Sequence, residues 1–211
     1  MKLIRNDWEV IPLPLREAKD FIAEHHYAKG SANTAVSTFG LFYKGDPNTL
    51  HGVSVWMPPP LGAAKSVCLE HRSVLALSRF CLVPDRPENA GSFLIAKSIK
   101  MLDDRWNMLL TYADTALHHD GGLYRASNWN FNGMTKKNPI YWDPMTNSMV
   151  SRKKGPKTLN QKEMFDLGYR LRGKFAKLRY IYKRSERKHI IINSRQTDEL
   201  MFTHDGFIYK G

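Results

Sequence analysis

The sequence predicts one α/β domain with a mixed central sheet flanked by helices, followed by a basic C-terminal extension. Three observations support this. At 211 residues the chain is long enough to bury a core without disulfides. Segments with strand-like and helix-like apolar spacing alternate along it. Lysine and arginine then crowd together, so we expect a domain over residues 1–150 and an extension over 151–211 that packs on it and contacts nucleic acid.

The first half of the chain predicts strand, helix, hairpin, strand and helix. Residues 16–27 carry apolar side chains at helical spacing, and a Gly-Asp-Pro-Asn turn at 45–48 separates two alternating segments. The expected strands are 8–13, 35–43, 50–57 and 74–83, and a second helix is expected over 93–106.

The second half predicts a buried strand at 108–113 and a helix-like segment at 123–129. Residues 131–135 and 140–142 resemble a closing pair of strands, and a turn at 143–147 leads to a returning strand at 149–152. A short helix is expected over 161–168, and strand-like segments near the C-terminal end have no assigned role.

The strongest global signal is charge. A formal net charge of +12 and a pI near 9.7 indicate a polyanionic partner, most often nucleic acid. From Arg152 to Lys188 the cations alternate with aromatic residues, a composition suited to phosphates and exposed bases, although a solvated basic face is the alternative. Two cysteines indicate a reducing compartment. No stretch has membrane-spanning length and no signal peptide is present, so we expect a cytoplasmic protein without membrane contact.

The central stretch runs from Thr111 to Trp129. Its buried strand ends on a carboxylate, Asp114, before a polar, glycine-bearing turn and a helix. Open α/β sheets place ligands at such strand ends, which makes Asp114 a candidate functional residue. The alternative is that Asp114 only caps the next element.

Two further features stand out, one inside the expected fourth strand and one in the loop before the expected second helix. Arg79 interrupts an apolar strand, which predicts either a β-bulge that exposes it or a paired structural arginine. The loop from Arg86 to Ser92 opens a helix directly after that strand, and the backbone N–H groups at a helix N-terminus form an anion site.

This order of elements resembles the fold of the GNAT acyltransferases, with the loop over residues 86–91 at the position of their pyrophosphate-binding turn. Arg86 and Gly91 fit the usual pattern, whereas Asn89 stands where the first glycine is expected. A closer resemblance, over roughly residues 8–185, is to the phage Mom DNA-modification proteins, and Arg152 to Pro156 fits that family's tail. The matching strings are His26-Tyr27, Gly40-Leu41-Phe42, Leu77-Ser78-Arg79, Asn89-Ala90-Gly91-Ser92-Phe93-Leu94, Thr111-Tyr112-Ala113-Asp114 and Tyr124-Arg125-Ala126-Ser127-Asn128-Trp129.

The Mom resemblance implies a transferase that converts adenine in double-stranded DNA to an N6-carbamoylmethyl derivative and so protects phage DNA from restriction. Such an enzyme has to turn the base out of the helix. Asp114, Tyr124 and His26 are then the expected catalytic residues: Asp114 accepts from the N6 amine, Tyr124 protonates the leaving group, and His26 is a further candidate base. The expected base contacts are Tyr27, Trp56, Asn128 and Trp129. The expected donor contacts are Arg79, Arg86, Asn89, Ala90, Gly91 and Ser92. The expected DNA contacts are Lys153, Lys154, Arg170, Arg172 and Lys174.

Several alternatives stay open at this point. The donor is acetyl-CoA or another acyl donor, and a glycyl donor such as charged tRNA is chemically admissible because glycyl and carbamoylmethyl groups are isomers. An N-acetyltransferase acting on a protein or small amine, and a non-enzymatic basic DNA-binding module, are the rival functions. A metal near His118, His119 and Asp120, or at the His25-His26 pair, has no recognised ligand spacing to support it, so none is expected.

Overall fold

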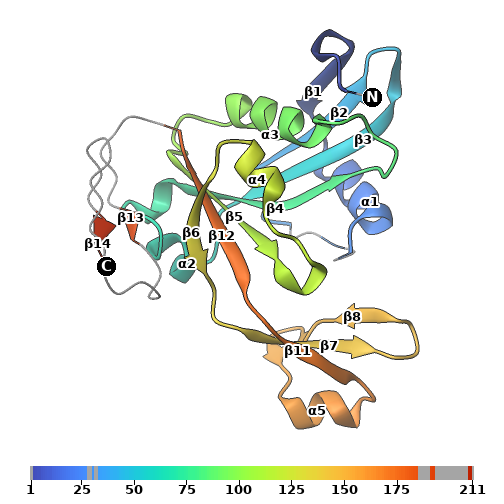
Figure 1. Cartoon of the computed structure of the whole chain (residues 1–211), viewed down its shortest axis with the longest axis vertical. Helices are drawn as coiled ribbons and strands as arrows, with labels where there is room; N and C mark the ends of the chain where they lie inside the picture. Colours follow the sequence, from blue (N-terminus) through green and yellow to red (C-terminus); the bar gives the residue numbers. More distant parts are fainter. Residues whose placement is uncertain (1, 28–29, 31–32, 185–190, 193–208, 211) are drawn as a thin grey trace.

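A computed structural model describes the chain except for residues 1, 28–29, 31–32, 185–190, 193–208 and 211. Its centre is a seven-stranded mixed sheet in the order β1-β2-β3-β4-β5-β12-β6 (Figure 1). All neighbours in this sheet are antiparallel except β4 and β5, which are parallel. The strands are β1 (Trp8–Pro12), β2 (Ser37–Tyr43), β3 (Asp46–Met57), β4 (Val74–Leu82), β5 (Met108–Asp114), β6 (Asn130–Met134) and β12 (Lys177–Lys183).

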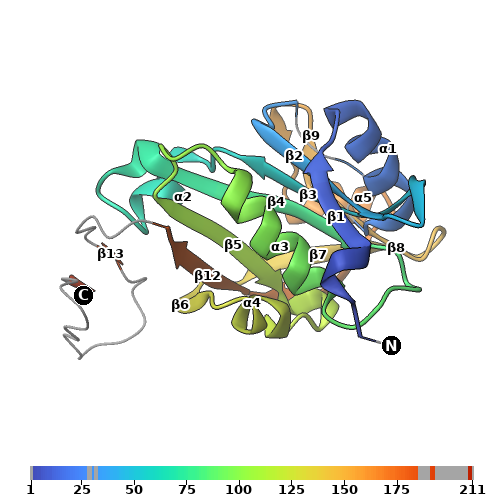
Figure 2. The same cartoon turned by 90° about the horizontal axis from the view of Figure 1, so that it is seen from above.

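Helices cover both faces of this sheet (Figure 2). Helix α1 (Leu15–His25) buries Ala18, Phe21 and Ile22 against β2, β3 and β4. On the same face α2 (Leu61–Lys65) packs over the first residues of β4 and β5. Helix α3 (Ala90–Met101) and the short α4 (Gly122–Ala126) lie on the opposite face, where Ile95 and Ile99 join the largest apolar cluster. Single 3₁₀ turns occupy Arg5–Asp7, His71–Ser73 and Thr115–Leu117.

A smaller unit projects from the main sheet (Figure 1). It consists of a three-stranded antiparallel sheet in the order β11-β7-β8, the two-stranded β9-β10 hairpin and α5. Tyr141, Leu159 and Met164 form its small core. The elements are β7 (Asn138–Asp143), β8 (Ser148–Val150), β9 (Lys153–Lys154), β10 (Lys157–Thr158), α5 (Gln161–Asp166) and β11 (Arg170–Phe175).

Most expected elements are present, but their partners differ in the second half. The segments 131–135 and 140–142 do not pair with each other, because β6 pairs with β12 whereas β7 pairs with β8 and β11. The sheets also do not divide at residue 150: β7 and β8 lie with β11, and β12 enters the main sheet between β5 and β6. The α/β class with a mixed central sheet between helices is confirmed.

The ends of elements show why some expected bounds shift. Helix α3 begins at Ala90 and ends at Met101, earlier than the expected 93–106, because Asn89 in a left-handed conformation (φ 68°) turns the chain into the helix. Helix α5 begins at a capping box formed by Asn160 and Glu163. In the C-terminal segment, β13 (Ile191–Ile192) and β14 (Tyr209–Lys210) pair in parallel, and the residues between them lie outside the described part. None of the described helices is both long and apolar enough to cross a bilayer.

Candidate functional site

Strands β4 and β5 form a cleft because they separate partway along their length. Their parallel pairing covers only Val74 to Ala76 against Met108 to Leu110. A bulge in β4 follows, since Val55 pairs with Arg79 and Trp56 with Leu77, which leaves Ser78 as the extra residue. A bulge bends its strand and breaks the ladder, so the two strands diverge. The expected bulge beside Arg79 is present, but it does not expose Arg79: the side chain is partly buried and hydrogen-bonded, as the alternative of a structural arginine predicted.

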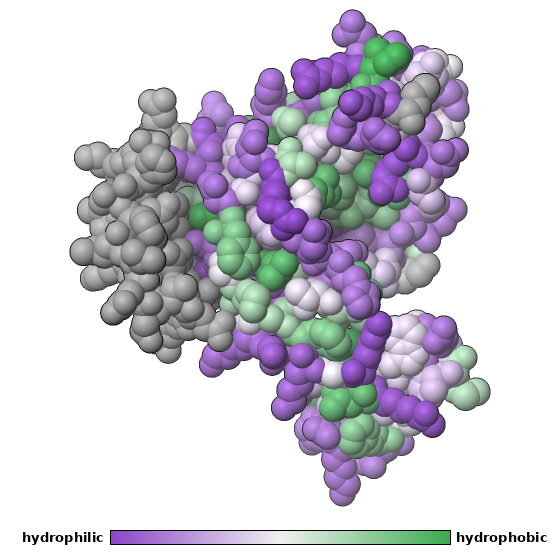
Figure 3. All heavy atoms as spheres, in the orientation of Figure 1, coloured by the Kyte–Doolittle hydropathy of each residue, from purple (hydrophilic) through white to green (hydrophobic). Residues whose placement is uncertain are grey.

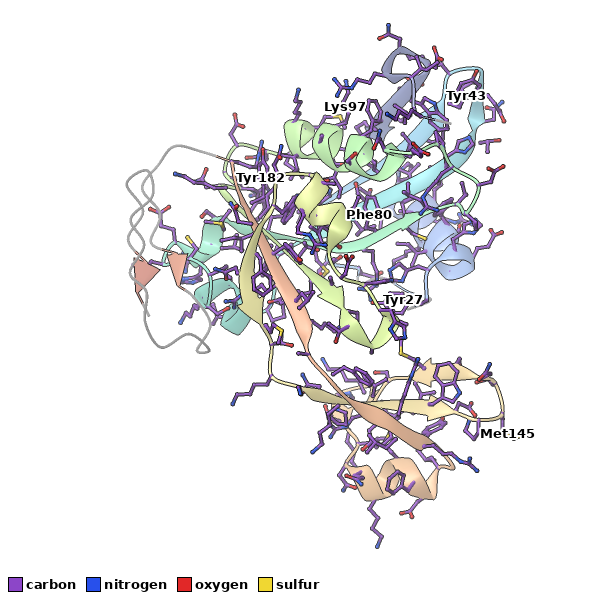
Figure 4. The ribbon with its side chains drawn as sticks, in the orientation of Figure 1. Tyr27, Tyr43, Phe80, Lys97, Met145 and Tyr182 are labelled. Carbon is purple, nitrogen blue, oxygen red and sulfur yellow. The ribbon has the colours of Figure 1, made fainter. Side chains whose placement is uncertain are left out.

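The cleft that results has a volume of about 940 Å³. β4 contributes Ser78 and Phe80, and β5 contributes Tyr112 and Ala113. In Figure 4, Phe80 lies beside α4 near one end, and Tyr27 marks the opposite end. A second hollow of about 920 Å³ lies elsewhere, around His71, Arg105 and Arg184. It contains none of the expected site residues, so the candidate site is the cleft between the diverging strands.

The N-terminus of α3 lines one end of the cleft. Arg86, Asn89, Ala90, Gly91 and Ser92 all face it, as the sequence predicted. Within the described chain, the N–H groups of Gly91 and Ser92 have no protein acceptor, whereas the Ser92 hydroxyl donates to the Asn89 carbonyl at 3.1 Å. Unpaired N–H groups at a helix start bind anions, because the helix dipole adds to their partial positive charge.

Glycine at position 91 has a packing reason. A Cβ atom there would lie 2.8 Å from Cδ1 of Leu123 on α4, so the absence of a side chain allows α4 to approach α3 closely. Arg86 is exposed and folds back on its loop, where its guanidinium donates to the carbonyls of Val83 and Pro84 at 3.1 and 3.3 Å. This end of the cleft therefore offers two backbone donors and one cation.

The opposite end gathers imidazole and phenol groups. His26 and Tyr27 follow α1 and stack with ring centroids 4.3 Å apart, and His119 lies edge-on to Tyr27 at 6.2 Å. Burial lowers the pKa of His26 to about 4, and the charges of Arg79 and His119 act in the same direction. His26 is therefore neutral at pH 7 and is able to accept a proton.

Tyr124 lines the cleft from α4. Burial raises the pKa of its phenol, and a hydrogen bond with Thr111 opposes that rise. Its ring packs on Tyr180 and Trp129 with centroids 5.5 and 5.9 Å away. The hydroxyl is thus held in its protonated form, and a protonated phenol is a proton donor.

Asp114 lies at the end of β5, as expected, but its side chain does not line the cleft. One oxygen accepts from the N–H of Ala116 at 3.1 Å, and the other lies 2.9 Å from Nζ of Lys177. The side chain is therefore a cap for the following 3₁₀ turn, which is the alternative that the sequence left open. A direct catalytic role for Asp114 stays a prediction.

Three of the four expected base contacts lie elsewhere. Trp56 and Trp129 are buried at 0% and 3% exposure and pack near each other in the core, with centroids 6.4 Å apart. Asn128 sits in a left-handed turn (φ 61°) and is exposed, but it does not face the cleft. Large aromatic side chains gain most from burial, which explains why these tryptophans became core. Only Tyr27, 45% exposed, lines the cleft.

Arg79 also points away from the cleft. Its Nε donates to the carbonyl of Gly30 at 2.7 Å, and NH1 donates to the carbonyl of Ser78 at 2.7 Å. It therefore ties the segment after α1 to the bulge, and it affects the site through the pKa of His26 instead of facing a donor.

The five expected DNA-contacting cations are all exposed on the smaller unit. Lys153 and Lys154 form β9, and the other three lie on β11, where Arg172 sits 5.2 Å from the centroid of the Trp142 ring. Two other cations of the same basic run differ. Lys177 pairs with Asp114, and Arg179 is buried with hydrogen bonds to Asn132 and Ser66. Only some of the cations in this basic run are therefore exposed on the surface.

The sequence reasoning missed Tyr112, Ser78 and Phe80 as cleft residues, and weighed His118 and His119 only as metal ligands. Alternation along β4 and β5 is the signal for the first three, but only the divergence of the strands opens a cleft beside them. In the described chain no group of three His, Cys, Asp or Glu side chains is arranged to hold a metal ion.

A mixed sheet with a splayed central parallel pair, opening beside a helix N-terminus, defines the GNAT-like fold class. Among solved structures, a proposed acetyltransferase from Acinetobacter baylyi ADP1 has a TM-score of 0.50 at 9% identity, with 83% of this chain and 91% of that chain covered. A GNAT family acetyltransferase from Elizabethkingia anophelis with acetyl-CoA bound has a TM-score of 0.47 at 10% identity, covering 84% and 99%. The ribosomal-protein-S18-alanine N-acetyltransferase from Escherichia coli has 0.48 at 12%, covering 92% and 99%.

Within this class the chain belongs to the Mom protein family, whose model matches residues 7–198. A comparison with curated protein sequences finds no match. The match covers both the main sheet and the smaller basic unit, so both units belong to the part of the chain that the family model describes.

Proposed function

We propose that this protein is a GNAT-type acyltransferase that modifies adenine in double-stranded DNA, leaving a carbamoylmethyl group on N6. The observation that carries the proposal is the membership of the Mom family over residues 7–198, combined with one cleft that has anion-binding donors at one end and proton-accepting groups at the other. Modification of phage DNA against restriction is the biological role that follows from the family resemblance.

The donor end suits a molecule with a pyrophosphate, as in acetyl-CoA. The N–H groups of Gly91 and Ser92 and the Arg86 guanidinium are complementary to phosphate oxygens. When bound, a glycyl ester or thioester would supply an activated acyl carbon: attack by N6 would form N6-glycyladenine and expel the alcohol or thiol, and the glycyl group would then rearrange to its carbamoylmethyl isomer. Acetyl-CoA itself would leave an acetyl group on N6.

The acceptor end suits an adenine that has left the base stack. The N6 amine is a poor nucleophile because its lone pair is delocalised into the ring, so it needs a proton acceptor as it attacks. Neutral His26 meets this need, and Tyr27 and His119 offer rings on which a base stacks. The Tyr124 hydroxyl returns a proton to the departing group. Asp114 acts as a positioning residue, since it caps the turn that leads to His118 and His119.

The DNA backbone is proposed to contact the smaller unit. Residues 136–174 contain ten lysines and arginines against three carboxylates, and the five cations named for DNA are exposed. Neutralising phosphates with such residues releases counterions, which provides affinity without sequence preference.

The deciding experiment is mass spectrometry of nucleosides from cells that express the protein. We expect a deoxyadenosine whose mass rises by one carbamoylmethyl group, with fragments that locate it on the base. A matched culture with His26→Gln should lack it. Acetylated protein with unmodified DNA would instead indicate an N-acetyltransferase, and DNA binding without either product would indicate a binding module. Supplying acetyl-CoA or glycyl-tRNA to purified protein and DNA identifies the donor.

A further inference from the structure

The tip of the β7-β8 hairpin carries an unusually exposed apolar side chain. Met145 is 90% exposed, whereas the next most exposed large apolar residue of the described chain, Ile4, is 59% exposed. Figure 4 shows Met145 at the far end of the hairpin, on the unit that projects from the main sheet. An apolar side chain held this far into water gains free energy from any apolar surface that receives it.

The turn that holds Met145 is closed by its own hydrogen bonds. The two oxygens of Asp143 accept from the N–H of Met145 at 2.8 Å and from the hydroxyl of Thr146 at 2.9 Å. The indole N–H of Trp142 donates to Asn147 at 3.0 Å. The hydrogen bonds to Asp143 also lower the pKa of its carboxyl. Met145 is thus presented on an ordered turn.

Two cations of the neighbouring strand β11 lie beside Trp142, next to the tip of this hairpin. Arg170 is the register partner of Trp142, and Arg172 lies over the ring of Trp142 at 5.2 Å. Figure 3 shows the surface hollowed between this unit and the main body. The basic surface is complementary to the phosphates on the outside of a DNA duplex, and the apolar tip is complementary to the stacked bases inside it.

We propose that the β7-β8 hairpin enters double-stranded DNA and inserts Met145 between base pairs, occupying the space that an adenine leaves when it turns into the cleft. This inference rests on the proposed function. An inserted apolar wedge offsets the cost of unstacking. Methionine suits the task, because its unbranched thioether adapts its shape to stacked bases.

Permanganate footprinting of a long mixed-sequence duplex tests the proposal, because permanganate oxidises thymines that have lost their stacking partners. We expect the wild-type protein to create reactive thymines opposite the displaced adenines. Met145→Ala should reduce that reactivity roughly tenfold or more, while DNA affinity by fluorescence anisotropy stays within about threefold, because the phosphate contacts remain. Met145→Leu should restore most of the reactivity. Met101→Ala, an exposed methionine at the end of α3, is the matched control and should behave as wild type.

The outcomes separate the two proposals. DNA binding without reactive thymines, or equal reactivity for wild type and Met145→Ala, overturns the wedge and leaves the proposed function intact. A tenfold loss of affinity for Met145→Ala without any thymine reactivity also overturns it, because the hairpin then only docks. Failure of the wild-type protein to bind DNA at all overturns both. Since Met145 contacts little of the protein, the variants should fold, and circular dichroism checks this.

Discussion

Nζ of Lys177 lies 2.9 Å from Oδ2 of Asp114, and the ion pair joins the last residue of β5 to the first residue of β12. The same two residues are register partners in the sheet. The carboxylate is 8% exposed and the ammonium 45%, so the pair lies at the rim of the sheet with its anion buried. The N–H of His119 donates to the backbone carbonyl of Asp114 at 3.2 Å, which connects this pair to the imidazole end of the cleft.

Asp114→Asn should lower the free energy of unfolding by about 1–3 kcal/mol, because it leaves the partly buried Lys177 without its counter-charge while the cap to Ala116 survives. Urea unfolding measures this. In a double-mutant cycle, Asp114→Asn should cost much less in a Lys177→Met background. If Asp114→Asn is as stable as the wild type but does not modify DNA, the structural role of Asp114 is contradicted, and its carboxylate acts directly in the reaction.

His26→Gln should reduce DNA modification by roughly 10²–10⁴-fold, the range for losing a general base. It should also change the dependence of stability on pH. The pKa of His26 is about 4 when folded and near 6.5 when unfolded, so only the unfolded state gains a proton between these values. The wild type therefore keeps its full stability above pH 6.5 and loses part of it as the pH falls from 6.5 to 4.

Unfolding in urea at several pH values compares the two proteins. The His26→Gln variant should not show the part of the stability loss at low pH that comes from protonation of His26. Parallel curves for wild type and variant between pH 6.5 and 4 would show that His26 is not buried in its neutral form.

Tyr124→Phe should lower modification by roughly 10²-fold, because the protonated phenol lines the cleft as a proton donor. Stability should fall by about 1 kcal/mol at most, for the hydrogen bond with Thr111. Tyr180→Phe is the control. The Tyr180 hydroxyl accepts a hydrogen bond from Arg125 and donates one to the Asp120 carbonyl, and it has no proposed role in the reaction. Single-turnover rates of this variant should therefore be nearly unchanged. Equal rates for Tyr124→Phe and wild type would exclude the hydroxyl from the reaction.

Gly91→Pro should weaken acetyl-CoA binding roughly 10–100-fold, because proline removes one N–H that faces a charged phosphate. Proline is tolerated in the first helical turn, so α3 should persist. Gly91→Ala is the matched control: it adds the same Cβ beside Leu123 but keeps the N–H. Calorimetry should therefore find near-normal affinity for alanine. Equal losses for both variants would assign the effect to crowding of α4.

Replacing Lys153, Lys154, Arg170, Arg172 and Lys174 with glutamine should weaken binding to duplexes of any sequence. The slope of log K against log salt should shrink by about 0.9 for each phosphate that the protein no longer neutralises. Neutralising Lys44 and Lys100, exposed on β2–β3 and α3, controls for net charge. If the slope stays the same after all five replacements, the basic surface is solvated and does not touch DNA.

Local sequence patterns specify most of the separate elements. Helix α1, the turn after β7 and α5 follow from patterns within about a dozen residues: an apolar helical face, Asp-Pro, and a capping box. The β2-β3 hairpin is also present, but its turn is Lys44-Gly45 and not the expected 45–48, because Tyr43 pairs with Asp46 and β3 begins there. The loop from Asn89 to Ser92 that opens α3 is also visible in the sequence, because it follows a strand pattern and precedes a helical one.

Which side chains meet depends on contacts between distant segments. β12 enters the sheet beside β5, 63 positions separate Asp114 from Lys177, and no local pattern encodes that pair. The bulge at Ser78 sends Arg79 to the segment after α1, and the divergence of β4 from β5 brings Tyr112 and His119 to the cleft. Trp56 and Trp129 are buried in the core because apolar residues of α3 and β12 pack in the same cluster. Local sequence fixes backbone conformation, whereas the sum of distant contacts decides whether an aromatic or a charged side chain ends at a site or in the interior.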